Sequence, residues 1–115
     1  MKYAFGPRIE PGGVCFRLWA PSAQNVEIEV EGLGITPMSF AADGWKQAFV
    51  ACRPGARYRF HTGDIVFADP ASRRQSGGVH GWRVVSAPAA HDGWRGRPWE
   101  EAVLYECHPG LMGGF

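Results

Sequence analysis

The stretch that decides the fold is VEIEVE, residues 26–31. Its apolar residues alternate strictly with three glutamates, and successive side chains of a β-strand point to opposite faces of a sheet. The alternation therefore predicts a strand with one face in a core and the other in water. Three carboxylates on one face also suggest a metal or acid–base site. No histidine or further ligand lies near them in the sequence, so we interpret them as a solvated sheet face.

Outward from this strand, the same period of two recurs. Pro37 interrupts its segment and so predicts an edge strand there, and Trp45 shares a strand face with Phe49, so we expect one of them to enter the core. Short strands about 8–12 residues apart, separated by Gly and Pro turns, predict an all-β, immunoglobulin-like (early-set type) β-sandwich. The other segments with this pattern are 14–20, 35–40, 45–51, 57–61 and 65–68.

The chain has 115 residues, which fits one domain. Its formal net charge of +1 gives no reason to expect nucleic acid or a membrane surface as partner. No apolar run suits a signal peptide or a membrane span, so we expect a cytoplasmic protein. The odd cysteine count predicts reduced thiols and neither a disulfide framework nor a zinc site, and no cofactor is expected. These cysteines are Cys15, Cys52 and Cys107.

The pattern changes after residue 68. Residues 69–81 are rich in Gly, Pro and Ser and predict an ordered loop, and Val84-Val85 is at most a short edge strand. We expect a sandwich domain over 1–86, a connector over 87–101, and a new element over 102–115. Its run AVLYEC, residues 102–107, predicts a strand that docks onto the sandwich edge or pairs with a second copy in a homodimer.

Four motifs resemble a known family. FRLWAP at 16–21 and PGARYRF at 54–60 are similar to the sandwich that precedes the catalytic barrel in the α-amylase (glycoside hydrolase 13) superfamily. DPASRRQSGGVHG at 69–81 and WRGRPWEEAVLYECH at 94–108 resemble the malto-oligosyltrehalose trehalohydrolase family, in which the second passage forms the first barrel strand. After His108 the sequence departs from that family and continues PGLMGGF.

The resemblance implies a sandwich like carbohydrate-binding module 48, followed by the start of a truncated barrel. The parent enzymes hydrolyse maltooligosyl trehalose to trehalose and maltooligosaccharide, with an Asp nucleophile and a Glu acid on later barrel strands. No position here matches those motifs, so the chain is expected to be a non-catalytic accessory domain. The alternatives are the equivalent domain of a branching or debranching enzyme, a stand-alone α-glucan-binding module, and a protein-interaction sandwich without a sugar role.

Candidate site residues fall into two groups. Tryptophan faces stack on glucose rings, so an α-glucan or maltooligosyl trehalose is a possible ligand, although packing is the ordinary role of such rings. Of them, Trp19 is expected to be the exposed one. In the 69–81 loop we expect Asp69 to cap the turn at Pro70 and Arg73 to pair with a carboxylate. The carbohydrate candidates are Trp19, Trp45 and Trp82, and the resemblance points to a barrel interface at Asp69, Arg73, His80, Tyr105 and His108.

Two catalytic arrangements are set aside. Ser72, His80 and Asp69 lack the motif context of a catalytic triad. Cys107 and His108 are adjacent on a predicted strand, so their side chains point to opposite faces and are badly placed to share a proton.

Overall fold

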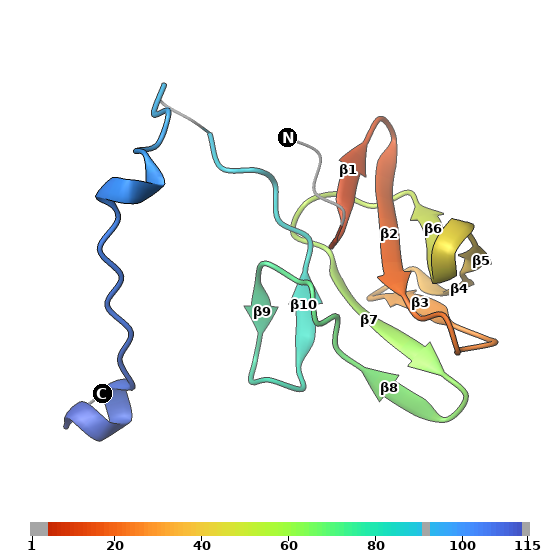
Figure 1. Ribbon diagram of the computed structural model, residues 1–115. Coiled ribbons are helices and arrows are strands. Elements are labelled where there is room, and N and C mark those ends of the chain that lie inside the picture. Colours follow the sequence, from red (N-terminus) through yellow and green to blue (C-terminus); the bar gives the residue numbers. More distant parts are fainter. Residues whose placement is uncertain (1–4, 91–92, 114–115) are drawn as a thin grey trace.

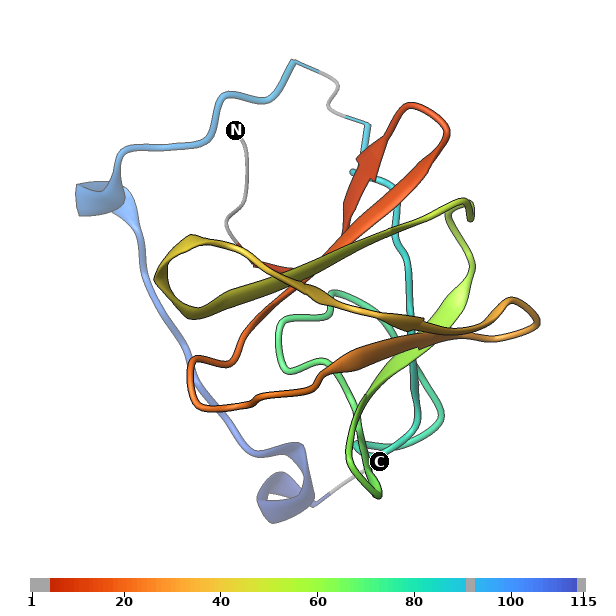
Figure 2. The same ribbon diagram turned by 90° about the vertical axis from the view of Figure 1, so that its right-hand side faces the viewer.

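The computed structural model of the chain describes residues 5–90 and 93–113. Within them lie ten β-strands and three short 3-10 helices, with no α-helix. The strands form two antiparallel sheets that face each other (Figures 1 and 2), which confirms the all-β sandwich; the immunoglobulin-like subtype stays a prediction. The first sheet has the order β1-β2-β6-β5, with β1 at Arg8–Glu10, β2 at Gly13–Trp19, β6 at Trp45–Val50 and β5 at Ser39–Phe40.

The second sheet has the order β4-β3-β7-β10-β9, and β8 pairs with β7 outside this path. The 3-10 helices are η1 in the β5–β6 turn and η2 and η3 in the C-terminal part of the chain. The bounds are β3 at Glu27–Val30, β4 at Gly34–Pro37, β7 at Arg57–Thr62, β8 at Ile65–Phe67, β9 at Gln75–Ser76, β10 at Trp82–Val84, η1 at Ala42–Gly44, η2 at Trp99–Glu101 and η3 at Pro109–Met112.

The core lies between the two sheets and consists of the side chains that the alternation predicts. The rings of Phe16 on β2 and Tyr58 on β7 are both fully buried, with centroids 4.8 Å apart, and so join the two sheets. Full burial of one large apolar side chain contributes about 1.5–3 kcal/mol, so a core of this size accounts for the fold. The other buried members include Val14, Leu18, Val26, Ile28, Val30, Met38, Phe60 and Val85.

The segment 35–40 differs from its prediction as a single edge strand. It forms β4 at the edge of the second sheet and β5 at the edge of the first, and the chain crosses between them at the buried Met38. Pro37 ends β4, because proline has no N–H with which to continue a ladder. After it, the Met38 N–H donates to the Val26 carbonyl oxygen at 2.9 Å and anchors the crossing.

Two further predictions are wrong. Neither Trp45 nor Phe49 enters the core, because the inward positions of β6 belong to Lys46 and Ala48, which are paired with Leu18 and Phe16 of β2. The segment around Val84 is not at an edge either: β10 lies between β7 and β9. Local alternation gives the two faces of a strand, whereas its neighbours in the sheet depend on the whole topology.

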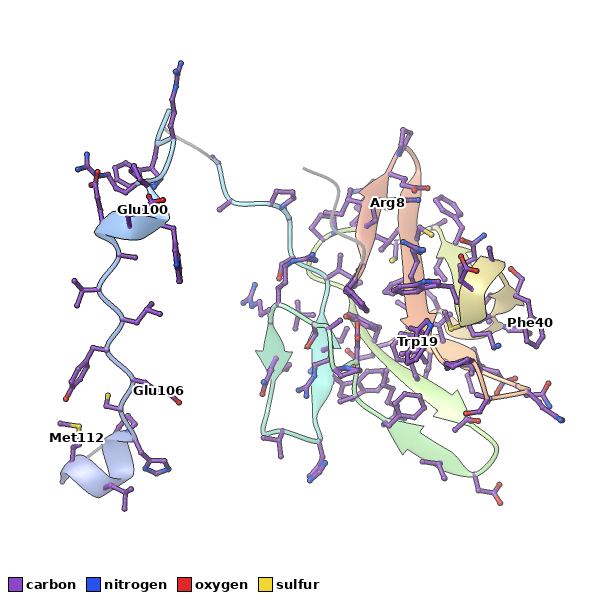
Figure 3. All side chains as sticks on the ribbon, in the orientation of Figure 1. Arg8, Trp19, Phe40, Glu100, Glu106 and Met112 are labelled. Atoms are coloured by element: carbon purple, nitrogen blue, oxygen red, sulfur yellow. The ribbon has the colours of Figure 1, made fainter. Side chains whose placement is uncertain are left out.

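The C-terminal part of the described chain extends away from the sandwich (Figures 1 and 3). The run 102–107 forms no strand and does not dock onto the sandwich, so that expectation is wrong within this chain. In the described C-terminal part, residues 93–113, the only elements of secondary structure are η2 and η3, which flank this run. Residue Val103 within it is 93% exposed. Pairing with a second copy stays a prediction.

Candidate functional site

The outer face of the first sheet holds two of the three candidate tryptophans. Trp19 and Trp45 are directly paired at one end of the β2–β6 ladder. The indole N–H of Trp19 donates to the carbonyl oxygen of Asp43 at 3.0 Å, yet the residue is 57% exposed, as predicted (Figure 3). Trp45 is more covered, because the Phe5 ring lies 5.1 Å from it and the Arg17 guanidinium 4.3 Å from its centroid. Trp19 therefore presents a ring that is both anchored and accessible.

The third candidate, Trp82, lies on the opposite outer face, that of the second sheet. The Arg59 guanidinium is 4.1 Å from its ring centroid, which is a cation–π contact. The same guanidinium bonds the Glu29 carboxylate twice, with Nε to Oε2 at 2.6 Å and Nη2 to Oε1 at 3.2 Å. Trp82 is therefore covered by a charged pair, and the three tryptophans do not form one sugar platform.

The three glutamates of residues 26–31 lie opposite basic residues of the neighbouring strand β7. Their face of the sheet is therefore not only solvated, as predicted, but also lined by ion pairs. The register pairs Glu27 with His61 and Glu29 with Arg59. An ion pair also joins Glu31 to Arg57 at 2.5 Å. His61 also contacts the Glu29 carboxylate, and the Arg59 hydrogen bond followed by that of His61 lowers the pKa of Glu29. A carboxylate held in this way is unsuited to acid–base catalysis.

Asp69 lies at the start of the 69–81 loop and is 1% exposed. Its Oδ2 accepts the Tyr58 hydroxyl at 2.7 Å and its Oδ1 accepts the Ala71 N–H at 2.8 Å, which confirms the predicted turn cap. Burial raises the pKa of Asp69, and burial followed by the nearby Asp69 charge raises the pKa of Tyr58. Because Asp69 is buried, its side chain cannot contact a neighbouring domain directly. It can affect such a contact only by fixing the conformation of the 69–81 loop.

Two arginines hold the rest of this loop through main-chain oxygens. Arg73 donates to the Phe5 carbonyl oxygen at 3.1 Å and so ties the loop to the N-terminal segment, while its predicted pairing with a carboxylate stays a prediction. Arg83, 7% exposed, donates to the Val79 carbonyl oxygen at 2.7 Å. The loop is thus fixed at both ends.

The remaining interface candidates are not brought together. His80 is exposed in the turn between β9 and β10, and Tyr105 and His108 belong to the C-terminal segment beyond η2. Tyr105 is 79% exposed and its hydroxyl lies 3.8 Å from the Met112 sulfur, while His108 accepts the Leu111 N–H at 3.3 Å. Their predicted contact with a barrel stays a prediction.

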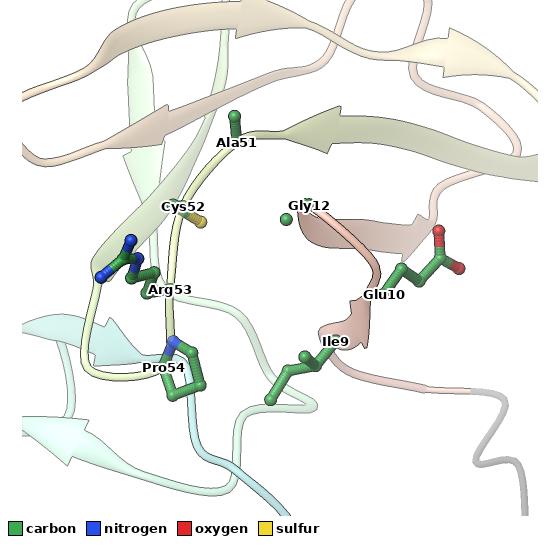
Figure 4. A pocket seen from close by; sticks show the side chains of 8 residues that line it. Ile9, Glu10, Gly12, Ala51, Cys52, Arg53 and Pro54 are labelled. Atoms are coloured by element: carbon green, nitrogen blue, oxygen red, sulfur yellow. The ribbon is translucent and has the colours of Figure 1, made fainter.

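A hollow of about 440 Å³ opens at one end of the sandwich, and none of the candidate residues lines it (Figure 4). Cys52 lies in its wall, and burial raises the pKa of this thiol, so the thiol is a poor nucleophile. Cys15, Cys52 and Cys107 are all unpaired. The residues lining the hollow are Ile9, Glu10, Gly12, Gly13, Ala51, Cys52, Arg53 and Pro54.

Within residues 5–90 and 93–113, no three His, Cys, Asp or Glu side chains gather into a possible metal site. No helix of that part of the chain is long and apolar enough to cross a membrane.

Two features of interest were missed by sequence reasoning. Lys46 is 1% exposed and lies among the core side chains. The alternation had already placed it on the side of β6 with Ala48 and Val50, so the signal was present. The Tyr58–Asp69 bond was also missed, although a buried tyrosine usually finds a partner for its hydroxyl.

Comparison with known proteins identifies relatives for most of the chain. Malto-oligosyltrehalose trehalohydrolase of Mycobacterium tuberculosis is 39% identical over 106 residues, which cover 84% of this chain and 18% of the relative. The chain is a homologue of the malto-oligosyltrehalose trehalohydrolases. The trehalohydrolase of Saccharolobus solfataricus agrees, with 33% identity over 94% of this chain and 20% of its own length. The resemblance seen in the motifs is thereby confirmed.

Solved structures extend the likeness to the wider starch-degrading enzymes. A Salmonella typhimurium protein described as an alpha amylase superposes with a TM-score of 0.76 and 37% identity, over 96% of this chain and 20% of its own. PulA of Klebsiella oxytoca superposes with a TM-score of 0.64 and 25% identity, over 74% of this chain and 10% of its own. No protein-family model matches the chain.

The chain spans about a fifth of the length of the trehalohydrolases that it matches, with shares of 18% and 20%. The matched portions are N-terminal portions of starch-family glycosidases.

Proposed function

We propose that this chain is the N-terminal accessory domain of a malto-oligosyltrehalose trehalohydrolase, is not itself catalytic, and packs against the catalytic barrel. The observation that carries the proposal is the state of the C-terminal segment. In sequence it resembles the family's connector and first barrel strand, and its large apolar side chains are unpacked. The exposed fractions are 93% for Val103, 78% for Leu104, 79% for Tyr105 and 86% for Leu111.

Such exposure is unfavourable in an isolated domain. Burying each of these side chains would contribute about 1.5–3 kcal/mol, and contiguous exposed apolar residues mark surfaces that bind another protein or domain. A barrel strand has apolar side chains on both faces, one toward the barrel interior and one toward the surrounding helices. The run 102–107 has this composition, so a barrel would cover it.

The carboxylates of the sandwich support a non-catalytic role. Retaining glycosidases need two carboxyl groups about 5–5.5 Å apart on either side of the scissile bond. Here Glu29 is held by Arg59 and His61, and Asp69 is enclosed under Tyr58. We therefore assign hydrolysis of maltooligosyl trehalose to trehalose and maltooligosaccharide, a step of trehalose biosynthesis, to the barrel. The three unpaired thiols support a cytoplasmic location.

A chimera tests the proposal. This chain replaces the 106 matched residues of the Mycobacterium tuberculosis trehalohydrolase, and trehalose release from maltooligosyl trehalose is measured. We expect an active chimera and no turnover by the chain alone. Val103→Asp is the informative variant: at a concentration at which the chain alone is monomeric, it leaves the unfolding midpoint of the chain unchanged, and it lowers that of the chimera. Turnover by the chain alone, or a barrel that neither folds nor acts with this domain attached, contradicts the proposal.

A second candidate function is contact with an α-glucan through Trp19. It is favoured by the anchored indole, which is 57% exposed and is paired across the strands with Trp45, whose ring carries the Arg17 guanidinium. Titration with maltoheptaose to millimolar concentration is expected to change tryptophan fluorescence. Trp19→Ala abolishes the change, whereas Trp99→Ala, which removes a ring that is 75% exposed on the C-terminal segment, preserves it. A flat titration, or equal loss in both variants, rejects a glucan site at Trp19.

A further inference from the structure

A short segment at the edge of the first sheet covers a buried charge. Lys46 on β6 is 1% exposed, and its Nζ has no hydrogen-bond partner among the described residues. The Phe40 ring lies over it from β5, with its centroid 3.7 Å from Nζ. A ring face attracts a cation, but it gives the three N–H groups of an ammonium no ordinary acceptor. The charge therefore destabilises this closed arrangement.

We call residues 39–44, which contain β5 and η1, the strap. None of its residues is buried, and its strand pairs with β6 over two residues only, at the end of the sheet. Phe40 is 69% exposed (Figure 3). Asp43 has a φ of 58°, in the left-handed region that is unfavourable for a residue with a Cβ. Few contacts thus oppose an opening of the strap, and the opening lets the Lys46 ammonium reach water.

The far end of the strap anchors the exposed indole of Trp19. The Trp19 N–H donates to the Asp43 carbonyl oxygen, and the Ala20 N–H donates to the Gly44 carbonyl oxygen, both at 3.0 Å. Gly44 also packs closely there, because a Cβ on it would lie 3.3 Å from the Trp19 ring nitrogen. Opening of the strap breaks both bonds and removes this anchor.

We propose that the strap opens while the rest of the sandwich stays folded, that the Lys46 ammonium favours the open state, and that an α-glucan on Trp19 favours the closed state. The inference deepens the second candidate function and rests on it for the glucan, whereas the opening rests on the sandwich alone. A sugar that stacks on Trp19 binds better when the ring is held. Preferential binding to one of two states shifts the population toward that state, so the strap regulates the sugar site.

Amide hydrogen exchange of the chain measures the opening. The reporters are the N–H groups of Ala20 and of Ala41, which donates to the Trp45 carbonyl oxygen at 2.8 Å. We expect both to exchange faster than the amides of the β2–β6 ladder. Lys46→Met removes the charge and keeps a similar length, so it slows both by about tenfold. Gln47→Met, on the exposed face of the same strand, leaves both rates unchanged.

Tyr58→Phe separates opening of the strap from unfolding of the whole domain. It removes the bond to Asp69 from the second sheet, so it speeds any exchange that needs global unfolding. We expect the Ala20 and Ala41 rates to stay unchanged in this variant, because local opening does not depend on that bond. An equal acceleration of these amides and the ladder amides overturns the separate opening. Unchanged rates in Lys46→Met overturn the role of the ammonium.

Acetylation by acetic anhydride gives an independent measure of the same opening. The chain has two lysines, Lys2 and Lys46, and mass spectrometry of peptides distinguishes them. The Lys46 amine is reached only in the open state. Maltoheptaose at about ten times its dissociation constant therefore slows both Lys46 acetylation and the Ala41 exchange by about tenfold, and Trp19→Ala abolishes this protection.

The sugar experiment distinguishes failure of the coupling from failure of the sugar site. A fluorescence change without protection of Lys46 and Ala41 overturns the coupling and leaves glucan binding intact. A flat fluorescence titration rejects the glucan site and the coupling with it. The exchange rates without sugar decide in either case whether the strap opens.

Discussion

Removal of one hydroxyl group, in Tyr58→Phe, tests the interaction between the core and the 69–81 loop. The Tyr58 ring is fully buried, so phenylalanine fills the same space and the change removes only the bond to Asp69 Oδ2 at 2.7 Å. A buried acceptor left without its donor costs about 1–3 kcal/mol, and the value for a carboxylate lies toward the upper end. One kcal/mol lowers the midpoint of a domain of this size by about 4–8 °C. We therefore expect a fall of about 8–16 °C for a loss of about 2 kcal/mol.

The pH dependence gives a second readout of the same variant. Burial raises the pKa of Asp69, while the Tyr58 hydrogen bond lowers it. Without that bond the pKa rises further, and a protonated Asp69 loses less when its donor is removed. In the variant, the folded state then binds more protons than the unfolded state over a wider range of pH. The free energy of unfolding therefore falls as pH rises through that range. The destabilisation by Tyr58→Phe is thus larger at neutral pH than in acid.

Thermal unfolding followed by circular dichroism, repeated across pH, measures both effects. Tyr105→Phe is the matched control, because that hydroxyl is on a residue 79% exposed and lies 3.8 Å from a methionine sulfur. It is expected to leave the midpoint unchanged. A Tyr58→Phe midpoint within about 2 °C of the parent would refute the assignment of the loop's stability to this bond.

Three further predictions concern other parts of the chain. Because folding lowers its pKa, Glu29 stabilises the fold at pH values above its unfolded pKa, and this contribution is lost as pH falls through the folded pKa. In Glu29→Gln we therefore expect the free energy of unfolding to depend less on pH in the acid range. Gly13→Ala lowers the urea midpoint strongly, since its Cβ would lie 2.4 Å from the Val50 carbonyl oxygen, whereas Gly78→Ala, with open space around it, does not. We expect the run 102–107 to pair between copies, so that light scattering gives a dimer that Val103→Asp converts to monomer; a monomer for the parent chain rejects this pairing.

Alternation of apolar and polar residues predicted the strands because each strand has one face in the core and the other in water. It placed Val26, Ile28 and Val30 inward, and Tyr58 and Phe60 with them, before any neighbour was known. The same rule fails where a strand changes sheets: the crossing at Met38 depends on which edges lie close together, and no local pattern records that. It put Lys46 on the same face of β6 as Ala48, but a charged side chain is ordinarily expected in water, so its burial was not predicted.

The candidate site was predictable in part. Exposure of Trp19 followed from its place opposite the apolar face of β2, and the Asp69 turn cap followed from the Asp-Pro sequence. The separation of Trp82 from the other tryptophans was not predictable, because it depends on which sheet β10 joins. The run 102–107 had the composition of a strand, but a strand needs a partner for its backbone groups, and composition does not supply one.

The two arginines that fix the 69–81 loop have a consequence for how such domains vary among species. Arg73 and Arg83 bond to carbonyl oxygens of residues such as Phe5 and Val79, and every amino acid carries that oxygen. Substitutions at the accepting positions therefore leave the loop's path unchanged, provided that the arginines and Asp69 persist. Exposed positions such as His80 can therefore carry different side chains while the backbone of the loop keeps the same path.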